Sequence, residues 1–370
     1  MASPANIVAL PPEVLAIIFK QLCTIKDIIS CKKVCTNWRN VIDTVFKDKG
    51  KFLLVSQKGH EILNLINPSA KYELFVDNVP RVKGATGGLL QKSPIVCGGN
   101  FNNEQGVMTG KDCIVIGQPE LKMKMLEKRR DPASIVLDQR MLWIVGGYTD
   151  KDFLGANESA PSDFNCTTEF IKLGQPTVKG PDLPFIFSEH SMIQYDKKSI
   201  YIIGGQQNLS SSNKTWIVDP TNDFKIREGP SLNVGMGRYG HSCAKMTLNN
   251  RIIIVVAGGL SNSEILDSVE ILDPTRNNNW TEGPNLPMKL MGIKMVTSPT
   301  GKGVIVIGGK TNRRKESKVL FELSESLEWI TLEQTLQKCH DFVTPIPDEL
   351  VYEKVQVKRN KNKRIKLSAK

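Results

Sequence analysis

Apolar and polar residues are arranged in blocks over residues 251–286 (RIIIVVAGGLSNSEILDSVEILDPTRNNNWTEGPNL). A first apolar run ends at Gly258-Gly259, a polar loop follows, a second run ends at Asp273-Pro274, and a third short segment carries Trp280. Short runs of aliphatic and β-branched residues bounded by Gly, Asn and Pro predict β-strands joined by tight turns. One such unit cannot bury both faces of its sheet, so the pattern predicts neighbours of the same kind.

The same pattern recurs along the chain. Asp219 follows Gly204 by 15 residues, just as Asp273 follows Gly258 by 15. Glycine doublets that close apolar runs begin at residues 98, 146, 204, 258 and 308, with steps of 48, 58, 54 and 50 residues. A period near 50 with a glycine doublet is the signature of the kelch repeat, and this part of the chain resembles a kelch β-propeller.

We therefore expect a mainly β protein, a six-bladed kelch-type β-propeller preceded by a small helical module. Residues 51–77 resemble a degenerate first blade, and the other blades are expected near residues 84–126, 133–184, 190–232, 239–287 and 291–333. Residues 338–352 are too few for a seventh blade. Because an open propeller leaves two unpaired edges, we expect this segment to supply inner strands to the first blade and close the ring.

Residues 10–42 carry a helical pattern instead. Pro11 and Pro12 favour a helix start, and apolar residues then recur at helical spacing up to Leu22. Thr24 with Asp27 predicts a capping box for a second helix, and a third helix is expected from residue 38 onward. Three short helices make only a marginal core, so we expect part of the apolar stripe to face a partner.

These residues also resemble the F-box, a three-helix module, in order and spacing. The matching positions are Leu10-Pro11-x-Glu13-x-Leu15, Ile18-Phe19, Leu22, Val34-Cys35 and Trp38-Arg39. The resemblance implies docking on the Skp-type adaptor of cullin–RING ubiquitin ligases. The adaptor-binding residues it suggests are Leu10, Pro11, Glu13, Val14, Leu15, Ile18, Phe19, Leu22, Ile28, Val34 and Trp38. The alternative is an amphipathic helical cap packed on the propeller.

Three regions follow from these patterns: a helical F-box module at residues 1–50, a propeller at 51–353 and a basic tail at 354–370, which is too polar to fold. The tail holds eight Lys and Arg and no acid, so the net charge of +11 leaves only +3 for the other 353 residues. The nearly neutral body disfavours nucleic acid as a partner. The tail resembles a nuclear-import signal, but an acidic partner, RNA or no role at all fits it equally.

The sequence shows no membrane span, since no apolar run reaches 18 residues, and its start shows no secretory signal. The eight cysteines form no C-x-x-C pair and mostly lie inside apolar runs. This pattern favours reduced, buried thiols in a cytoplasmic or nuclear protein. We therefore interpret as chance matches the five N-x-S/T triplets, which begin at Asn157, Asn165, Asn208, Asn213 and Asn279.

No catalytic chemistry is indicated by the sequence. The four histidines lie far apart, and none has a cysteine or carboxylate at ligand spacing, so we expect no metal site and no cofactor. Walker loops, nucleophile elbows and H-E-x-x-H motifs are lacking. The tyrosine–cysteine–histidine set of galactose oxidase, a copper enzyme with a kelch-type propeller, is not recognisable either. We expect a non-catalytic protein.

A protein target is expected on the loops at one face of the propeller, because rigid strands hold such loops in place. Arg and Tyr are favoured interface anchors, and the candidates are Arg130, Arg238, Tyr239, Arg313 and Arg314. For each of them, simple solvated loop charge is the alternative. The function implied is that of a substrate receptor in a Skp–cullin–F-box ubiquitin ligase. The alternative is a kelch scaffold, such as an actin-binding or regulatory adaptor.

Overall fold

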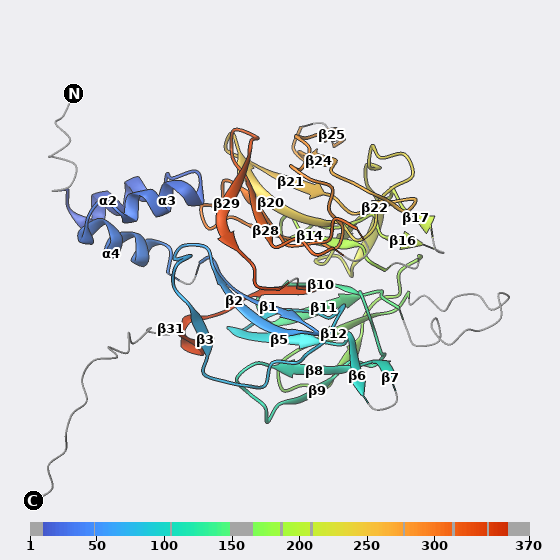
Figure 1. Cartoon of the computed structure of the whole chain (residues 1–370). Helices are drawn as coiled ribbons and strands as arrows, with labels where there is room; N and C mark the ends of the chain where they lie inside the picture. Colours follow the sequence, from blue (N-terminus) through green and yellow to red (C-terminus); the bar gives the residue numbers. More distant parts are fainter. Residues whose placement is uncertain are drawn as a thin grey trace, which may run out of the picture.

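The computed structural model describes residues 10–47, 49–103, 106–148, 166–185, 188–207, 210–276, 278–312, 315–338 and 340–353. Three helices stand at one side of a ring of β-blades (Figure 1). The molecule is mainly β and its propeller has six blades, which confirms the predicted fold class. In the described part of the chain, no helix has the length and apolar character needed to cross a membrane.

The helical module consists of α2 (Pro12–Phe19), α3 (Ile25–Lys32) and α4 (Thr36–Val45). Pro12 occupies the first position of α2, where a helix needs no N–H donor. The Thr24 hydroxyl accepts the N–H of Asp27, and the Asp27 carboxylate accepts the N–H of Thr24. This reciprocal pair is the predicted capping box of α3. The starts of α2 and α3 are therefore set by local sequence.

Five blades are four-stranded antiparallel sheets, and each takes its strands from one continuous stretch of chain. Their second strands are largely buried, because neighbouring blades pack on both faces, and this explains their continuous apolar runs. The strands, blade by blade, are β4 (Thr86–Leu90), β5 (Ser93–Cys97), β8 (Asp112–Val115) and β9 (Lys122–Lys124); β10 (Ala133–Leu137), β11 (Met141–Val145), β12 (Thr168–Ile171) and β13 (Val178–Lys179); β14 (Ser191–Gln194), β15 (Ile200–Ile203), β18 (Thr215–Asp219) and β19 (Lys225–Glu228); β20 (Ser242–Leu248), β21 (Arg251–Ala257), β24 (Val269–Leu272) and β25 (Trp280–Glu282); β26 (Lys294–Thr297), β27 (Val304–Ile307), β28 (Val319–Leu323) and β29 (Trp329–Thr335).

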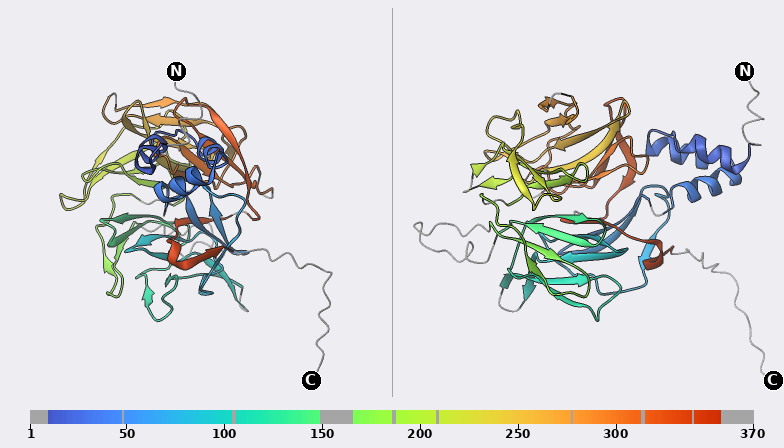
Figure 2. Two further views of the ribbon diagram at one scale, coloured as in Figure 1. Left: turned by 90° about the vertical axis from the view of Figure 1, so that its left-hand side faces the viewer. Right: turned by 180° about the vertical axis from the view of Figure 1, so that it is seen from behind.

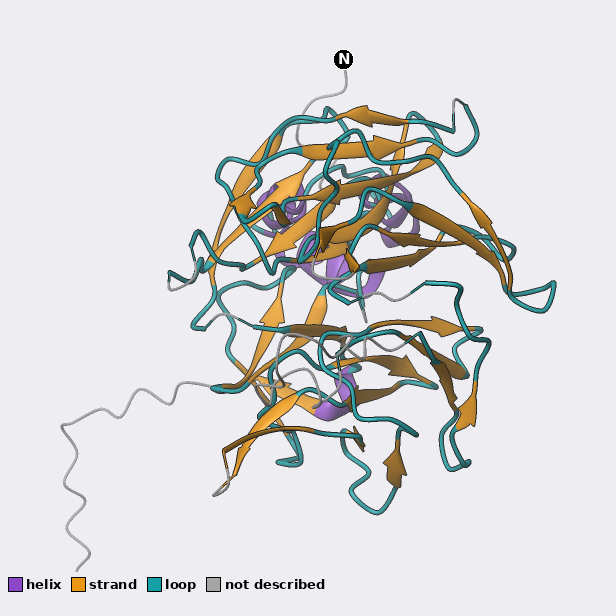
Figure 3. Cartoon of the chain, turned by 90° about the vertical axis from the view of Figure 1, so that its right-hand side faces the viewer, coloured by secondary structure: helices purple, strands orange, loops and turns teal. Residues whose placement is uncertain are grey.

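Short hairpins extend from three of these blades. They are β6 (Asn100–Asn103) with β7 (Gly106–Thr109), β16 (Gln206–Gln207) with β17 (Ser210–Ser211), and β22 (Leu260–Ser261) with β23 (Glu264–Ile265). The hairpins lie on the side of the propeller away from the helices (Figure 1). In the view onto this side, the helices lie behind the blades (Figure 3). We call it the hairpin face.

The first blade in chain order combines both ends of the propeller sequence. Strand β1 (Lys51–Ser56) pairs with β2 (Gly59–Asn64) on one side and with β30 (Phe342–Pro345) on the other. Beyond β2, strand β3 (Tyr72–Leu74) pairs with β31 (Val351–Glu353), which follows a short 3-10 helix, η2 (Asp348–Leu350). The C-terminal segment thus supplies the innermost strand of the first blade and joins the ring.

The glycine doublets lie where the strand end of one blade meets a turn of the next. Gly258 has φ +62, and a Cβ added to it would lie 2.5 Å from the carbonyl oxygen of Leu290. At Gly204, with φ +57, the same atom would lie 2.6 Å from the carbonyl oxygen of Arg238. Only glycine combines this backbone conformation with so close an approach, which is why the doublets mark the repeat.

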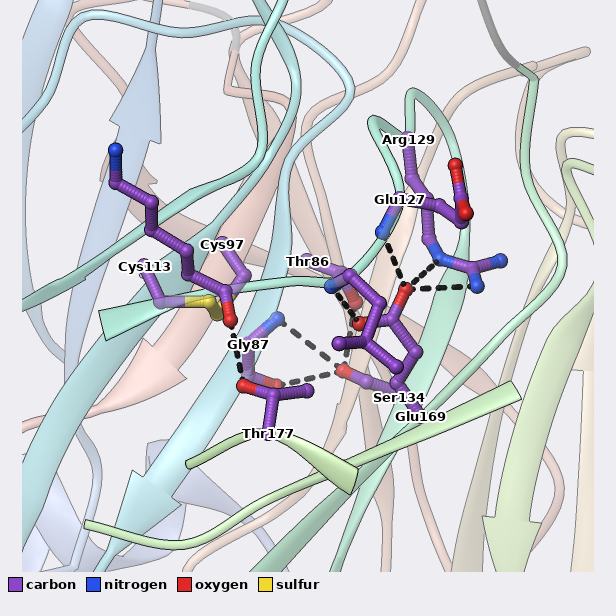
Figure 4. The surroundings of a disulfide bond; sticks show 11 residues. Thr86, Gly87, Cys97, Cys113, Glu127, Arg129, Ser134, Glu169 and Thr177 are labelled. Carbon is purple, nitrogen blue, oxygen red and sulfur yellow. Dashed lines mark hydrogen bonds and ion pairs between the residues drawn. A yellow bond between two sulfur atoms is a disulfide. The ribbon is translucent and has the colours of Figure 1, made fainter. Parts of the chain in front are cut away.

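Cys97 and Cys113 form a disulfide between the neighbouring strands β5 and β8 (Figure 4). The expectation that all eight cysteines are reduced is therefore wrong for this pair. The two residues are separated by 16 positions in the sequence and become direct partners only through the register of the two strands. Among the other described cysteines, Cys243 is a buried free thiol.

Candidate functional site

The helical module has a core of its own. Leu15, Phe19 and Ile28 are buried to 1% exposure or less and pack with Val41 and Ile42. The prediction that these first three side chains contact an adaptor needs correction, because in this chain they face inward. Three packed helices need apolar side chains buried between them, so these side chains are not available to a partner. Of the other predicted adaptor contacts, Leu10, Leu22 and Trp38 are partly buried against the same core.

The outer side of α2 carries an exposed apolar surface. Val14, Ile17 and Ile18 are 40%, 62% and 42% exposed, and Val34, between α3 and α4, is 50% exposed. We call the three exposed residues of α2, Val14, Ile17 and Ile18, the α2 surface. Ile17 is not among the predicted adaptor contacts, although its spacing of three from Val14 places both on one side of the helix. Pro11 and Glu13 are also exposed.

Helix α3 attaches the module to the propeller. Ile25 is buried among Phe52, Leu65 and other propeller residues, and Ile29 packs against the same cluster. The carboxylate of Glu322, on β28, accepts the backbone N–H of Ile25 at 2.9 Å. The alternative of a helical cap packed on the propeller thus describes α3, whereas α2 lies farther from the ring (Figure 1).

The attachment continues in the loop before α3. The Thr300 hydroxyl donates a hydrogen bond to the carbonyl of Cys23, and the Lys302 ammonium donates to the carbonyl of Gln21. Lys302 also lies 3.3 Å from the carboxylate of Glu325. The sixth blade in chain order therefore holds both the loop and the first turn of α3, which fixes the orientation of the module.

On the hairpin face, the turns before the inner strands surround the central channel. Gly84, Asp131, Glu189, Gly240 and Gly292 occupy equivalent positions in five blades, all with φ between +50 and +67. Backbone N–H groups of Asp131, Glu189, Gly240 and Gly292 each donate to the carbonyl of the preceding member, at 2.7 to 3.1 Å. This chain of hydrogen bonds ties neighbouring blades together around the channel. Two of the five positions carry acidic residues although the conformation favours glycine.

The channel mouth forms a pocket of about 100 Å³ on this face. Asp131, Glu189, Asp341 and Lys294 contribute its charged lining. Burial raises the pKa of Glu189 and of Asp341, and the nearby Asp131 carboxyl raises both further. Such a mouth suits hydrogen-bond donors or cationic groups of a ligand. These acids are not among the predicted site residues, although Glu189 stands in the register position that glycine holds in three other blades.

The predicted target-binding residues differ in burial, and two of them are not among the described residues. Arg130 is partly buried beside the mouth, 3.1 Å from the Asp131 carboxylate and 5.0 Å from the centre of the Tyr148 ring, and Tyr239 is also partly buried. Arg313 and Arg314 lie outside the described residues.

Arg238 is fully buried, so the prediction that it binds a target is wrong. Its guanidinium lies 2.7 Å from the Glu270 carboxylate and also donates to the carbonyls of Gly258 and Ser268. Arg129 forms the equivalent buried pair with Glu169 in another blade (Figure 4). Both arginines hold the turn before an inner strand against the third strand of the blade.

Among the described residues, no group of three or more His, Cys, Asp or Glu is arranged to hold a metal ion. His190 and His241 lie at the channel pocket, and burial lowers the pKa of each to about 3. Both are therefore neutral near pH 7 and add no positive charge to the mouth.

A small helical module with a spare apolar surface, fixed to a propeller, defines a class of protein-binding adaptors. The F-box-like family profile matches residues 7–47, and the kelch motif matches residues 240–287. Together with the six-bladed propeller, the two matches support an F-box/kelch-repeat protein. F-box domains generally bind Skp-type adaptors, kelch propellers bind protein targets, and this architecture is typical of non-catalytic adaptors.

The wider comparisons concern the fold. No curated protein sequence matches the chain. Among solved structures, that of YjhT is similar with a TM-score of 0.60 and 13% identity, over 74% of this chain and 91% of that one. In total, 379 solved chains match, and a fold used so widely carries no information on the target.

Proposed function

We propose that this chain is the substrate receptor of a Skp–cullin–F-box ubiquitin ligase. The observation that carries the proposal is the α2 surface, an apolar group left exposed on a module that the propeller holds by its other side. A surface of this kind is typical of a protein–protein interface. Val14, Ile17, Ile18 and Val34 would pack on the adaptor, with Pro11 and Glu13 at the border.

The target would bind on the hairpin face, around the channel mouth. The helical module and the hairpin face lie on opposite sides of the propeller (Figure 1), so the adaptor and the target would bind apart from each other. Figure 2 shows the helices at one side of the ring in two further views. Holding the target close to the ligase raises its effective concentration near the conjugating enzyme. The chemistry of ubiquitin transfer belongs to the RING partner and its conjugating enzyme, and this chain provides position. Such a receptor works in the cytoplasm or the nucleus.

Co-purification of the full chain with a recombinant Skp-type adaptor tests the proposal. Ile17→Asp places a charge in the centre of the α2 surface, and we expect at least about a tenfold loss of adaptor affinity. Asn37→Asp, an exposed change on α4, is the matched control and should bind normally. Because both residues are exposed, the stability of both variants should stay within about 0.5 kcal/mol of the parent chain.

The second candidate function is a kelch scaffold that acts without ubiquitination. It becomes the better description if the parent chain does not bind the adaptor. Proximity labelling in proteasome-inhibited cells then identifies targets, with the parent chain and Ile17→Asp compared. With an active proteasome, targets of a ligase should be recovered in larger amounts with the variant than with the parent chain, and proteasome inhibition should remove this difference. Partners of a scaffold should show equal amounts with both chains in either condition.

A further inference from the structure

The first blade is one strand short. The other five blades have four strands each, whereas the sheet of this blade contains β30, β1 and β2. Strand β3 follows β2 in the chain and lies near it, but it forms no ladder with β2 and pairs with β31 instead. Among the described strands, β2 pairs with β1 alone, so its outer edge is unpaired. Such an edge is a template for another strand.

A groove of about 930 Å³ lies along this edge. It is lined by three residues of β2, by most residues of segment 68–77, by the end of β29 and by Gln337. The β2 residues are His60, Glu61 and Ile62. Ile62, Leu74 and Val76 are half-buried and give it an apolar floor, which rests on the core beneath. The hollow is therefore open to a chain segment and partly lined by groups that favour side-chain burial.

The rim of the groove is acidic. Its lining includes the carboxyl groups of Glu61, Glu73, Asp77 and Glu333 and one lysine, Lys71, while Lys338 and Lys318 lie near Glu61 and offset part of this charge. Burial and nearby cations lower the pKa of His60, so it adds no positive charge near pH 7. This excess of acid stands on a chain whose net charge is +11. The acidic rim therefore favours a cationic partner, although the whole protein carries a net positive charge.

We propose that this groove binds an extended segment of a partner protein in which basic and apolar residues alternate. The segment adds to β2 as the fourth strand of the blade, and its backbone completes the hydrogen bonds of the β2 edge. Because successive side chains of a strand point to opposite sides, its apolar residues face Ile62 and Leu74 while its Lys or Arg residues meet the acidic rim. This site is independent of the adaptor and of the channel mouth.

The test uses the purified full chain and a fluorescent peptide in which Lys and Val alternate. We expect saturable binding by anisotropy, together with slower hydrogen exchange of the β2 amides at residues 60–64. A peptide with Glu in place of Lys should bind much more weakly. Replacing Asp77 and Glu333 by lysine together should weaken binding of the Lys peptide several-fold, since both are exposed rim residues. Glu328→Lys, an exposed change on the same blade as Glu333 but outside the groove, should leave binding unchanged.

Three results would overturn the inference. Equal binding to the parent chain and to the Asp77 and Glu333 double variant would place the peptide elsewhere. Binding without slower exchange in β2 would exclude strand addition. Binding that appears only after removal of residues 354–370 would show that the chain's own basic tail, and not a partner, takes the groove.

Discussion

The carboxylate of Glu322 accepts the backbone N–H of Ile25, with distances of 2.9 Å to Oε2 and 3.3 Å to Oε1. Glu322 belongs to the propeller, and Ile25 is the first residue of helix α3. A carboxylate at the positive end of a helix is favourable, and this one also accepts the Ser298 hydroxyl at 2.8 Å. One buried side chain thus joins the helical module to the ring.

Glu322→Ala should destabilise the full chain by about 1–3 kcal/mol, because it leaves the N–H of Ile25 and the Ser298 hydroxyl buried without their acceptor. Glu322→Gln should cost less, since its amide oxygen still accepts a hydrogen bond. Urea unfolding measures both, with the exposed Glu328→Ala as control. If the alanine variant matched the parent chain, Glu322 would not hold the module.

The same residue predicts a pH dependence. Burial raises the pKa of Glu322 from 4.5 to about 7, so the folded state disfavours its charged form. Relative to Glu322→Gln, the parent chain should be most stable below pH 4.5 and should lose stability as the pH rises through 7, by roughly 3 kcal/mol at most. Urea unfolding of both chains between pH 5 and 8, within this range, measures the difference. If the free energy of unfolding of the parent chain rose with pH relative to that of Glu322→Gln, the raised pKa of Glu322 would be contradicted.

Arg238→Ala should lower the free energy of unfolding by about 3–5 kcal/mol, because it leaves the Glu270 carboxylate buried without its partner. Replacing both members by apolar residues, Arg238→Met with Glu270→Leu, should cost less than the single change. Lys214→Ala removes an exposed pair with Glu228 and should cost no more than about 1 kcal/mol. Thermal or urea unfolding measures the free energy of unfolding of these three variants. Similar losses in all three would show that burial of the ion pair does not determine the loss of stability.

Glu189→Gly should raise the free energy of unfolding by about 1 kcal/mol, because Glu189 has φ +50 and a carboxyl group that burial disfavours. The same change should reduce the recovery of targets in proximity labelling, since it removes charge from the channel mouth. Asp138→Gly is the control. Asp138 has φ +47 and lies exposed in the turn between β10 and β11. This variant should therefore gain stability and recover the same targets as the parent chain.

The Cys97–Cys113 disulfide predicts a linked peptide pair when the protein is digested and mapped without reductant. Reduction should lower the free energy of unfolding by about 2–4 kcal/mol, the usual range for closing a loop of this length, here 16 residues. Cys97→Ala with Cys113→Ala should behave like the reduced chain. Unlinked peptides from protein purified without reductant would contradict the pairing.

Much of the fold was predictable because its signals are local. The apolar runs, the glycine doublets and the turn residues around Asp219 and Asp273 recur with a fixed spacing, and each repeat forms one blade. The capping box of Thr24 and Asp27 involves residues three positions apart. The candidate site was less predictable, because a helical stripe such as Leu15, Ile18 and Phe19 does not show which members turn inward.

The repeat, the blade count and the helical module follow from the sequence alone, since strands, turns and helix starts depend on residues close together in the chain. Which apolar side chains of α2 stay exposed, that Arg238 is buried, and that Glu322 meets Ile25 across 297 positions of sequence are known only from the three-dimensional structure. The same is true of the pairing of β3 with β31 and of the groove along β2. These outcomes depend on distant segments competing for the same contacts, and neither composition nor periodicity records that competition.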